Sequence, residues 1–362
     1  MESLRERSRL GEIIVNKLGS ERDFDIVKIM EYNAKERCCG WCYALGPTMR
    51  CSKCLRAYCS RECQVKDWKT GCHKLWCGKS GEKCVDYEIR DAGEKGLGLF
   101  TLRDFERGEK ILVERAVATK PDALGRPIDS SKLLESTTLM SATMALAPTE
   151  SSSLTVKFVT NSAALSDDDV EDGGSGLFLN FSRVNHDCIG NADHYYVPDL
   201  KLMLLVAKCA IPAGTEVTFS YAGSASSTQR GMMLRARGFQ CTCTACQDPA
   251  IASELDRALE LDQKILSFGS FGNVGQAIRA GESLIKLHDK FHASDRLYSR
   301  VYYDLFQIAI TKKSSVKLGS KYILQAYTHA LRFYGREEDE EVKRLKRFVD
   351  SPSAHRNYRI MD

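Results

Sequence analysis

Three closely spaced cysteines carry the clearest chemical signal in the chain. They follow the pattern Cys241-x-Cys243-x2-Cys246. Thiolates at this spacing are typical zinc ligands, because a short stretch of backbone can aim them at one ion. A tetrahedral site needs a fourth donor, and we expect the distant Cys188 to supply it. The alternative is a set of incidental free cysteines, which this spacing disfavours.

A larger group of candidate ligands lies between residues 38 and 77. It contains four pairs of Cys or His residues, so eight donors and two tetrahedral zinc sites are expected. A segment this short has little core of its own, and metal binding must contribute much of its folding free energy. Cys38 and Cys72 adjoin two of the donors, and either is an alternative ligand to its neighbour. The pairs are Cys39-x2-Cys42, Cys51-x2-Cys54, Cys59-x3-Cys63 and His73-x3-Cys77.

Polar residues of a different kind surround Cys188. Asn185 and His186 directly precede it and follow an apolar run, while Tyr221 ends a later apolar segment. We expect these segments to meet in space, so that Asn185, His186 and Tyr221 line one site and the metal at Cys188 holds that site closed. A half-buried tyrosine at the edge of a core is the alternative interpretation of Tyr221.

Composition limits the class of protein. The 362 residues suffice for two or three domains, and a hydrophobic fraction of 43% is ordinary for a globular chain. A formal net charge of +4 does not favour nucleic acid as a direct ligand. No apolar run reaches the ~18 residues of a membrane helix, and no signal peptide is expected. The cytoplasm or nucleus is therefore the expected location, where clustered cysteines indicate zinc rather than disulfides.

The elements that must position these residues suggest an α+β multidomain protein. We expect an N-terminal helical segment over 1–37, the zinc-rich segment over 38–77, a β-rich domain over 84–247 and a helical domain over 248–362. Apolar positions at helical spacing in the last segment indicate a stack of helices, and Gly335 is expected to end one of them. Strands are expected over 85–90, 97–101, 110–115, 201–207 and 217–221, and a helix over 131–144.

Two known modules resemble this pattern. The segment 38–77, with Tyr58, Gln64, Trp68 and His73-Lys74 around its cysteines, resembles a MYND-type zinc finger. The ordered set after it resembles the SET domain of protein lysine methyltransferases with a post-SET zinc, so the chain is similar to the SET–MYND class. That set is Gly96-x-Gly98, Asn185-His186-x-Cys188-x2-Asn191, the segment 214–221 and Cys241-x-Cys243-x2-Cys246.

The resemblance implies an activity and roles for particular residues. It implies a protein-lysine N-methyltransferase that uses S-adenosylmethionine, with a pseudoknotted β-rich fold and a tetratricopeptide-like helical domain. Tyr221 would be the catalytic residue. The finger would interleave its pairs and serve protein interaction, with a proline-rich peptide as one possible ligand, or only support the structure. The cofactor would contact Lys95, Leu97, Asn161, Asn185, His186, Tyr221 and Phe239. One finger zinc would bind Cys39, Cys42, Cys59 and Cys63, the other Cys51, Cys54, His73 and Cys77, and a third ion the post-SET cysteines with Cys188.

The sequence also departs from the family pattern at named positions. Asp187 replaces the usual Ser, Gly190 replaces the usual Pro, and Arg237 stands where an aromatic residue often helps to form the lysine channel. The finger also precedes Gly96 instead of interrupting the domain after the glycines. A zinc-binding adaptor that keeps the fold without catalysis is therefore the alternative function. The resemblance implies a lysine of a histone or of a non-histone protein as the substrate.

Overall fold

The computed structural model describes residues 39–41, 47–53, 56–69, 73–77, 86–120, 127–134, 137–166, 173–198 and 200–362. The expected helical segment 1–37 and the cysteines Cys38, Cys42, Cys54 and Cys72 lie outside these residues. The chain divides into two compact units. The first contains the described residues of Met1–Leu102, Val113–Arg183 and Tyr195–Met203, and the second contains those of Arg103–Leu112, Val184–His194 and Leu204–Asp362.

Short strands and short helices make up the first unit. Its strands are β1 (Met49–Arg50), β2 (Ala57–Tyr58), β3 (Tyr87–Asp91), β4 (Leu97–Thr101), β6 (Ala118–Lys120), β7 (Ser162–Ala164) and β8 (Ser175–Leu177). Its helices are α3 (Arg61–Lys69), α4 (His73–Trp76), α5 (Ser131–Leu134), α6 (Thr137–Met144) and α7 (Leu154–Asn161), with 3-10 turns η1 (Gly93–Lys95) and η2 (Phe181–Arg183). Strands β3 and β4 pair antiparallel, as do β1 and β2, and β6, β8 and β7 form a three-stranded sheet.

The β3–β4 connection depends on two glycines. Gly93 and Gly96 have φ angles of 67° and 75°, a left-handed region that side chains with a Cβ rarely adopt. The Gly96 N–H donates to the Gly93 carbonyl at 2.9 Å and closes the turn. These glycines thus shape a hairpin, and the predicted strand over 97–101 is confirmed.

Helix α7 was not expected from the sequence. Ser153 caps its N-terminus by accepting from the Val156 N–H, and Phe158 is 1% exposed within a core that includes Leu133 and Leu177. The helix predicted over 131–144 is present as two helices, α5 and α6, among the described residues.

Three strands run from one unit into the other. They are β5 (Lys110–Glu114), β10 (Ala192–Val197) and β11 (Leu202–Ala207). The second unit adds β9 (Asn185–His186) and β12 (Glu216–Phe219). Its helices are α8 (Ser227–Ala236), α9 (Thr244–Gln247), α10 (Pro249–Ser270), α11 (Val274–Lys290), α12 (Asp295–Ala309), α13 (Val316–Tyr334) and α14 (Glu340–Asp350), with 3-10 turns η3 (Lys313–Ser315) and η4 (Pro352–Ala354).

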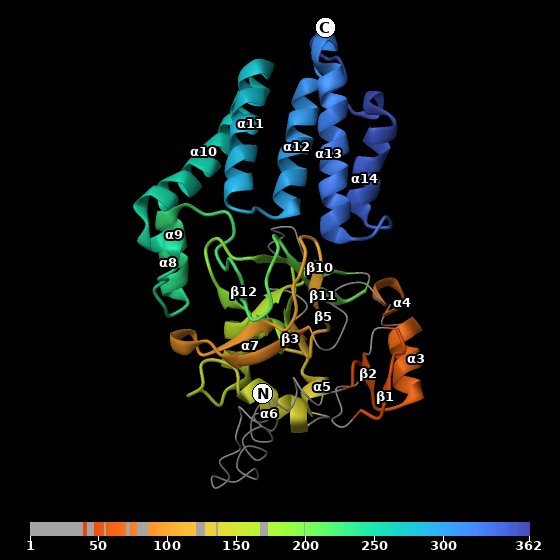
Figure 1. Ribbon diagram of the computed structural model, residues 1–362, viewed down its shortest axis with the longest axis vertical. Coiled ribbons are helices and arrows are strands. Elements are labelled where there is room, and N and C mark those ends of the chain that lie inside the picture. Colours follow the sequence, from red (N-terminus) through yellow and green to blue (C-terminus); the bar gives the residue numbers. More distant parts are fainter. Residues whose placement is uncertain are drawn as a thin grey trace. The chain divides into compact units, whose positions relative to one another are not determined.

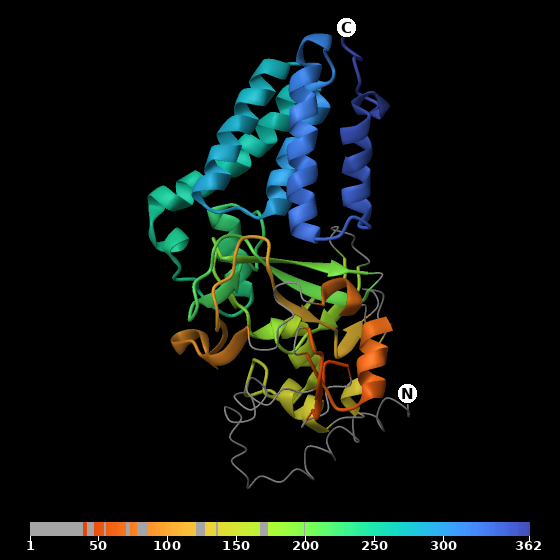
Figure 2. The same cartoon turned by 45° about the vertical axis from the view of Figure 1, so that its right-hand side comes forward.

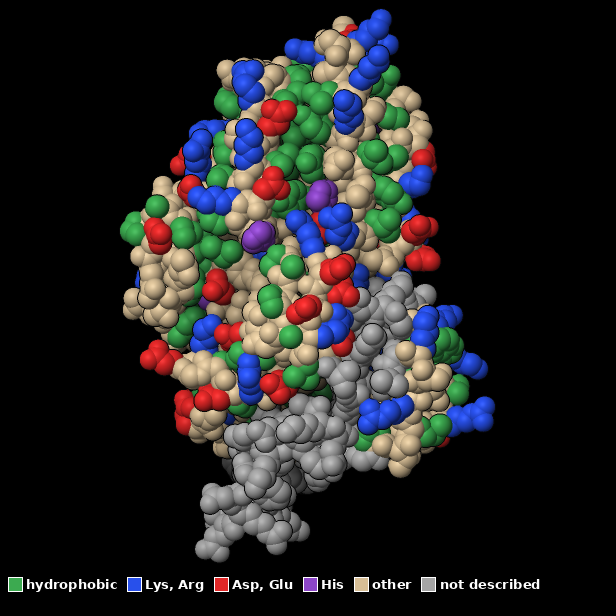
Figure 3. Space-filling view, in the orientation of Figure 1, with side chains coloured by type: hydrophobic (Ala, Val, Ile, Leu, Met, Phe, Trp, Pro, Cys, Tyr) green, Lys and Arg blue, Asp and Glu red, His purple; other side chains and the backbone are tan. Residues whose placement is uncertain are grey.

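Helices α10 to α14 lie side by side, which confirms the predicted helical stack (Figures 1 and 2). Leu305, Phe306 and Leu345 are 0% exposed at its core. Figure 3 shows hydrophobic side chains gathered between α11 and α13, with charged side chains on the outer surfaces of the helices. Gly335 ends α13 with a φ of 67°, as predicted. None of the helices among the described residues has the length and apolar character needed to cross a membrane.

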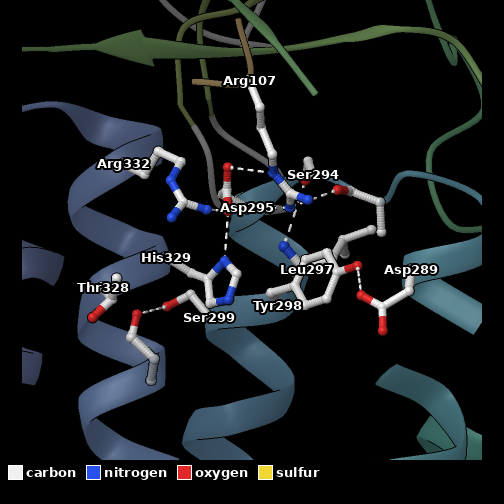
Figure 4. Close-up of polar contacts among 12 residues, drawn as sticks. Arg107, Asp289, Ser294, Asp295, Leu297, Tyr298, Ser299, Thr328, His329 and Arg332 are labelled. Carbon is white, nitrogen blue, oxygen red and sulfur yellow. Dashed lines mark hydrogen bonds and ion pairs between the residues drawn. The ribbon is translucent and has the colours of Figure 1, made fainter. Parts of the chain in front are cut away.

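One buried carboxylate joins the loop before β5 to three positions in the helical stack (Figure 4). Asp295, at the start of α12, is 3% exposed and accepts two hydrogen bonds from Arg107, each at 3.1 Å. Arg332 of α13 donates to it at 3.1 Å, and His329 Nδ1 lies 2.5 Å away. Such charge-assisted hydrogen bonds are about twice as strong as neutral ones. The Asp295 cluster therefore fixes α12, α13 and the loop at Arg107 to one another.

Candidate functional site

Two very short strands bring the expected site residues of the second unit together. Strands β9 and β12 pair in parallel, with Asn185 opposite Thr218 and His186 opposite Phe219. Tyr221 follows the end of β12 and therefore lies beside His186, with 5.2 Å between the ring centroids. Phe239 completes the group, since its ring centroid lies 5.9 Å from that of His186 and 6.3 Å from that of Tyr221.

The hydroxyl of Tyr221 has a fixed direction and a fixed protonation state. It donates to the Val184 carbonyl at 2.7 Å. Burial of the side chain raises the pKa of Tyr221 to about 12, against the opposing effect of the Arg237 guanidinium, which lies 5.5 Å from the ring centroid. The hydroxyl therefore keeps its proton at neutral pH, and its oxygen lone pairs stay available to accept weak contacts.

Both ring nitrogens of His186 have partners within the protein. The Tyr221 backbone N–H donates to Nδ1 at 3.0 Å, and Nε2 lies 3.3 Å from Cys188 Sγ. The ring is only slightly exposed, at 6% of the residue surface. Hydrogen bonding of a ligand would therefore have to use the backbone of His186.

Two residues near Asn185 were given no role by sequence reasoning. Glu216 accepts from the Asn185 side chain at 2.8 Å. Asn191 binds β12 with both ends of its amide: Nδ2 donates to the Glu216 carbonyl at 2.8 Å, and Oδ1 accepts from the Thr218 N–H at 2.9 Å. The Asn191 side chain thus forms hydrogen bonds with the β12 backbone of the kind that a neighbouring strand would form. Its place in the Asn185-His186-x-Cys188-x2-Asn191 motif was the available signal.

Cys188 lies with the three later cysteines. The four Sγ atoms of Cys188, Cys241, Cys243 and Cys246 are within 4.8 Å of one another, and those of Cys188 and Cys246 are 3.5 Å apart. A hydrogen bond from the Cys188 thiol lowers the pKa of Cys243 to about 4. Four soft sulfur donors at this separation fit a tetrahedral zinc or iron site, and a bound cation would ionise the remaining thiols.

The turn that carries Cys188 explains two departures from the family pattern. Asp187 Oδ1 accepts from the backbone N–H groups of Ile189 and Gly190 at 2.8 and 3.2 Å, so the carboxylate shapes the turn. Gly190 has a φ of 28°, and a Cβ there would lie 2.8 Å from both Phe219 Cα and the Thr218 carbonyl oxygen. The turn therefore approaches β12 too closely for any side chain at position 190.

The zinc-rich segment of the first unit gathers its donors in two groups. The side chains of Cys39, Cys59 and Cys63 lie within 4.8 Å of one another, and so do those of Cys51, His73 and Cys77. This interleaved grouping is the one that the resemblance implies. The two other expected ligands, Cys42 and Cys54, lie outside the described residues. Burial lowers the pKa of His73 to about 4, so the imidazole is neutral at pH 7, as a metal ligand must be.

A buried carboxylate supports His73 and ties the segment to residues beyond it. Asp67 is 1% exposed and accepts from Tyr58 Oη and Arg56 Nε at 2.8 Å and from Arg115 Nη1 at 3.1 Å. Tyr58 Oη also lies 2.9 Å from His73 Nδ1. Such hydrogen bonds to the outer nitrogen of a histidine orient the ring toward a metal.

Comparisons with known proteins identify similar sequences. Residues 96–222 match the SET domain family model. The chain is 24% identical over 282 residues to "Histone-lysine N-methyltransferase set5" of Schizosaccharomyces pombe, covering 74% of this chain and 85% of that protein. It is 26% identical over 214 residues to "Histone-lysine N-methyltransferase SMYD3" of Homo sapiens, covering 55% of this chain and 49% of that protein. Residues 96–222 are therefore a SET domain, and the chain is similar to proteins named histone-lysine N-methyltransferases.

A solved structure also matches over most of its length. It is the "Crystal structure of the SET domain of LSMT bound to Lysine and AdoHcy", at 14% identity, with 82% of this chain and 88% of that chain covered. The TM-score is 0.30, which is too low to support a comparison of folds. The similarity to SET-domain proteins therefore depends on the sequence matches.

The remaining expected cofactor residues of the SET domain lie in the first unit. Lys95 is exposed at the end of η1, and Leu97 is half-buried at the start of β4. Asn161 ends α7, and its side-chain amide donates to the carbonyls of Ala147 and Lys157 at 2.6 and 2.8 Å. The second unit holds Asn185, His186, Tyr221 and Phe239, and the geometry given above applies to these four residues.

Proposed function

We propose that this SET-domain protein transfers a methyl group from S-adenosylmethionine to a lysine side chain of another protein. The observation that carries the proposal is the Tyr221 hydroxyl, held by the Val184 carbonyl beside His186 and Phe239. Methyl transfer to an amine is an in-line displacement, in which alignment of the reacting groups contributes most of the rate enhancement. A rigid, uncharged hydroxyl suits that task.

The hydroxyl oxygen of Tyr221 would accept weak hydrogen bonds from the methyl group that is transferred. S-adenosylmethionine, when bound, supplies an electrophilic methyl group on a positively charged sulfur. The lone pairs of the Tyr221 oxygen can accept weak C–H hydrogen bonds, each worth about 0.5–1 kcal/mol. Because the pKa of Tyr221 is raised to about 12 by burial, the hydroxyl remains protonated and does not act as the base at neutral pH.

The substrate amine must be neutral before it can attack. The rings of Tyr221 and Phe239 offer apolar surface that would desolvate a lysine ammonium group, which lowers its pKa. The Arg237 guanidinium near the Tyr221 ring adds a positive charge, which acts in the same direction. The arrangement therefore favours the reactive neutral amine without a dedicated general base.

For the cofactor, we propose the residues that the family resemblance assigns. Asn185, His186, Tyr221 and Phe239 of the second unit and Lys95, Leu97 and Asn161 of the first would contact it. Asn185 is oriented by Glu216, and His186 would contribute through its backbone because both ring nitrogens are engaged.

We further propose three zinc ions and a MYND finger over residues 38–77. One ion binds Cys188 with Cys241, Cys243 and Cys246, where the donor set is complete. The two finger ions take the described donor groups, together with Cys42 in one and Cys54 in the other. The boundaries 84–247 for the SET domain with its post-SET motif and 248–362 for the helical domain belong to the same proposal, as does a nuclear or cytoplasmic location.

The finger presents a surface for a protein partner. Val65 and Trp68 on α3 are each 42% exposed, and the Trp68 ring lies edge-on to His73 with 5.3 Å between ring centroids. Exposed aromatic and aliphatic side chains on a small rigid module are typical of peptide recognition, and the family resemblance suggests a proline-rich peptide.

The proposal is tested with Tyr221→Phe and with Tyr327→Phe as a matched control on α13. Purified proteins are incubated with methyl-labelled S-adenosylmethionine and a panel of histones and cell-extract proteins. Wild type and Tyr327→Phe should transfer label to lysine, and Tyr221→Phe should lose most of that activity. Equal labelling by both variants would refute the role of Tyr221.

The adaptor function is separated from the enzyme by calorimetry. Binding of S-adenosylmethionine in the micromolar range supports the enzyme. Absence of both binding and labelling would instead leave a zinc-binding adaptor that uses the finger and the helical domain for protein interaction, which is the second candidate.

A further inference from the structure

Val184, His186 and Cys188 occupy every second position of one segment. The first two contact Tyr221, and the third belongs to the four-cysteine site. The Val184 carbonyl accepts from the Tyr221 hydroxyl at 2.7 Å, and His186 Nδ1 accepts from the Tyr221 backbone N–H at 3.0 Å. Cys188, two residues further, belongs to the four-cysteine site. Tyr221 is thus fixed at its hydroxyl and at its backbone by residues that immediately precede a candidate metal ligand.

The hydrogen bond at Nδ1 determines the tautomer of His186. A nitrogen that accepts from a backbone N–H must present its lone pair, so the neutral ring carries its proton on Nε2. Nε2 lies 3.3 Å from Cys188 Sγ, within hydrogen-bond distance for sulfur. The ring therefore donates to Cys188, and one tautomer satisfies both contacts.

A donor directed at Cys188 Sγ suits a metal-bound thiolate. A coordinated cysteine is deprotonated and anionic, so it accepts a hydrogen bond better than a neutral thiol does. Hydrogen bonds to ligand atoms orient the ligand, and their loss typically costs about 10–100-fold in metal affinity or activity. His186 therefore contacts the tyrosine on one side and a candidate zinc ligand on the other.

We propose that His186 is a positioning residue that couples the four-cysteine metal site to Tyr221. A metal bound to Cys188 would fix the position of the thiolate, and the thiolate would accept a hydrogen bond from the Nε2–H group. Nδ1 then accepts a hydrogen bond from the Tyr221 N–H and fixes that part of the backbone. The effect on methyl transfer rests on the proposed function, whereas the coupling itself does not. A histidine that is merely packed in the core would fill space without linking the two groups.

The chain offers variants that separate the two contacts. In His186→Asn, the side-chain oxygen can replace the Nδ1 acceptor, but the side chain is too short to reach Cys188. In His186→Gln, the amide N–H can replace the Nε2 donor, but the Nδ1 acceptor is lost. His186→Phe keeps the ring and loses both contacts, and Cys246→Ser disturbs the metal site without touching His186.

Metal release is the first measurement. Zinc transfer from each protein to a coloured chelator is followed in time, and the two finger ions serve as internal references. One of three ions should leave His186→Asn and His186→Phe about 10–100-fold faster than wild type, the range for a lost hydrogen bond to a ligand. His186→Gln should release it near the wild-type rate. Unchanged release from His186→Asn and His186→Phe would overturn the proposal.

Coupling to Tyr221 is read by NMR and does not require methyl transfer. Tyrosine-labelled protein reports the Tyr221 backbone N–H, which is assigned as the signal missing from Tyr221→Phe. Cys246→Ser should shift that signal in the wild-type background and leave it nearly unmoved in the His186→Phe background. An equal shift in both backgrounds would overturn the coupling.

Histidine-labelled protein tests the tautomer in the same way. The nitrogen signals of His186, missing from His186→Asn, should show the proton on Nε2, and a proton on Nδ1 would refute the relay. If wild type transfers no methyl group while these measurements behave as expected, the coupling stands and the proposed function fails. If the enzyme is active, His186→Gln should lower kcat more than it raises KM for the lysine substrate.

Discussion

Replacing Asp295 by Asn should destabilise the second unit strongly. The carboxylate is 3% exposed and accepts from Arg107 and Arg332, with His329 also in contact. Hydrogen bonds to charged groups contribute about 1.5–3 kcal/mol each, and breaking a buried ion pair costs about 3–5 kcal/mol. The Arg107 and Arg332 side chains are 29% and 41% exposed, so water can replace part of the loss. We therefore expect a cost of about 3 kcal/mol, at the lower end of the range for a buried pair.

Thermal denaturation followed by circular dichroism measures the effect. A cost of about 3 kcal/mol corresponds to a fall in Tm of roughly 6–12 °C for a cooperative unit of 150–250 residues. The matched control is Asp350→Asn, which removes the same charge from an exposed pair with Lys346 on α14. That change should cost less than about 0.5 kcal/mol. If the two variants melt within about 2 °C of each other, the Asp295 cluster does not stabilise the fold as described.

The same carboxylate predicts how the difference depends on pH. Burial works to raise the pKa of Asp295, but hydrogen bonds from His329 and Arg107 outweigh it and hold the pKa below its usual value. A group with a depressed pKa contributes stability above its unfolded pKa of about 3.9 and loses that contribution as the pH falls through its folded pKa. The stability difference between wild type and Asp295→Asn should shrink below about pH 4.

Two other variants test the turn and the metal site. Gly190→Ala places a Cβ 2.8 Å from backbone atoms of β12, and this clash should add about 1–3 kcal/mol to the backbone strain of a positive φ, measured by chemical denaturation. Gly214→Ala, which meets no atom within 4 Å, should cost only its backbone strain of about 1–2 kcal/mol. Equal costs would show that the turn can move away from β12. Cys246→Ser should lower the zinc content by one of three proposed ions in elemental analysis, while Cys209→Ser, outside the candidate metal groups, should keep all three. A full zinc content in Cys246→Ser would remove that cysteine from the donor set.

Local spacing explains which parts of the site could be predicted. Zinc ligands such as Cys241 and Cys243 are recognisable because a metal constrains residues that are close in sequence. The partnership of Cys188 with them came from the need for a fourth donor and from the family resemblance, and the structure places its sulfur among theirs. The long helices were predictable as well, because apolar residues at helical spacing mark them.

Other features depend on contacts that no local pattern reveals. Strand β9 has two residues, too few for any periodicity, so its parallel pairing with β12 could not be predicted. Helix α7 was missed although Ser153, its capping residue, is visible in the sequence. The engagement of both His186 ring nitrogens was also unexpected, because it depends on a backbone N–H from Tyr221 and a sulfur two residues away.

The chain passes several times between the two units, and this limits which fragments of the protein can fold. Each unit is assembled from three separate stretches, and three of the five points at which the chain changes unit fall inside β5, β10 and β11. A truncation after residue 183 would deprive the first unit of residues 195–203, and a fragment beginning at residue 204 would lack two pieces of the second. Limited proteolysis should therefore not release either unit as a folded fragment, and recombinant work on either unit requires the other stretches of the chain as well.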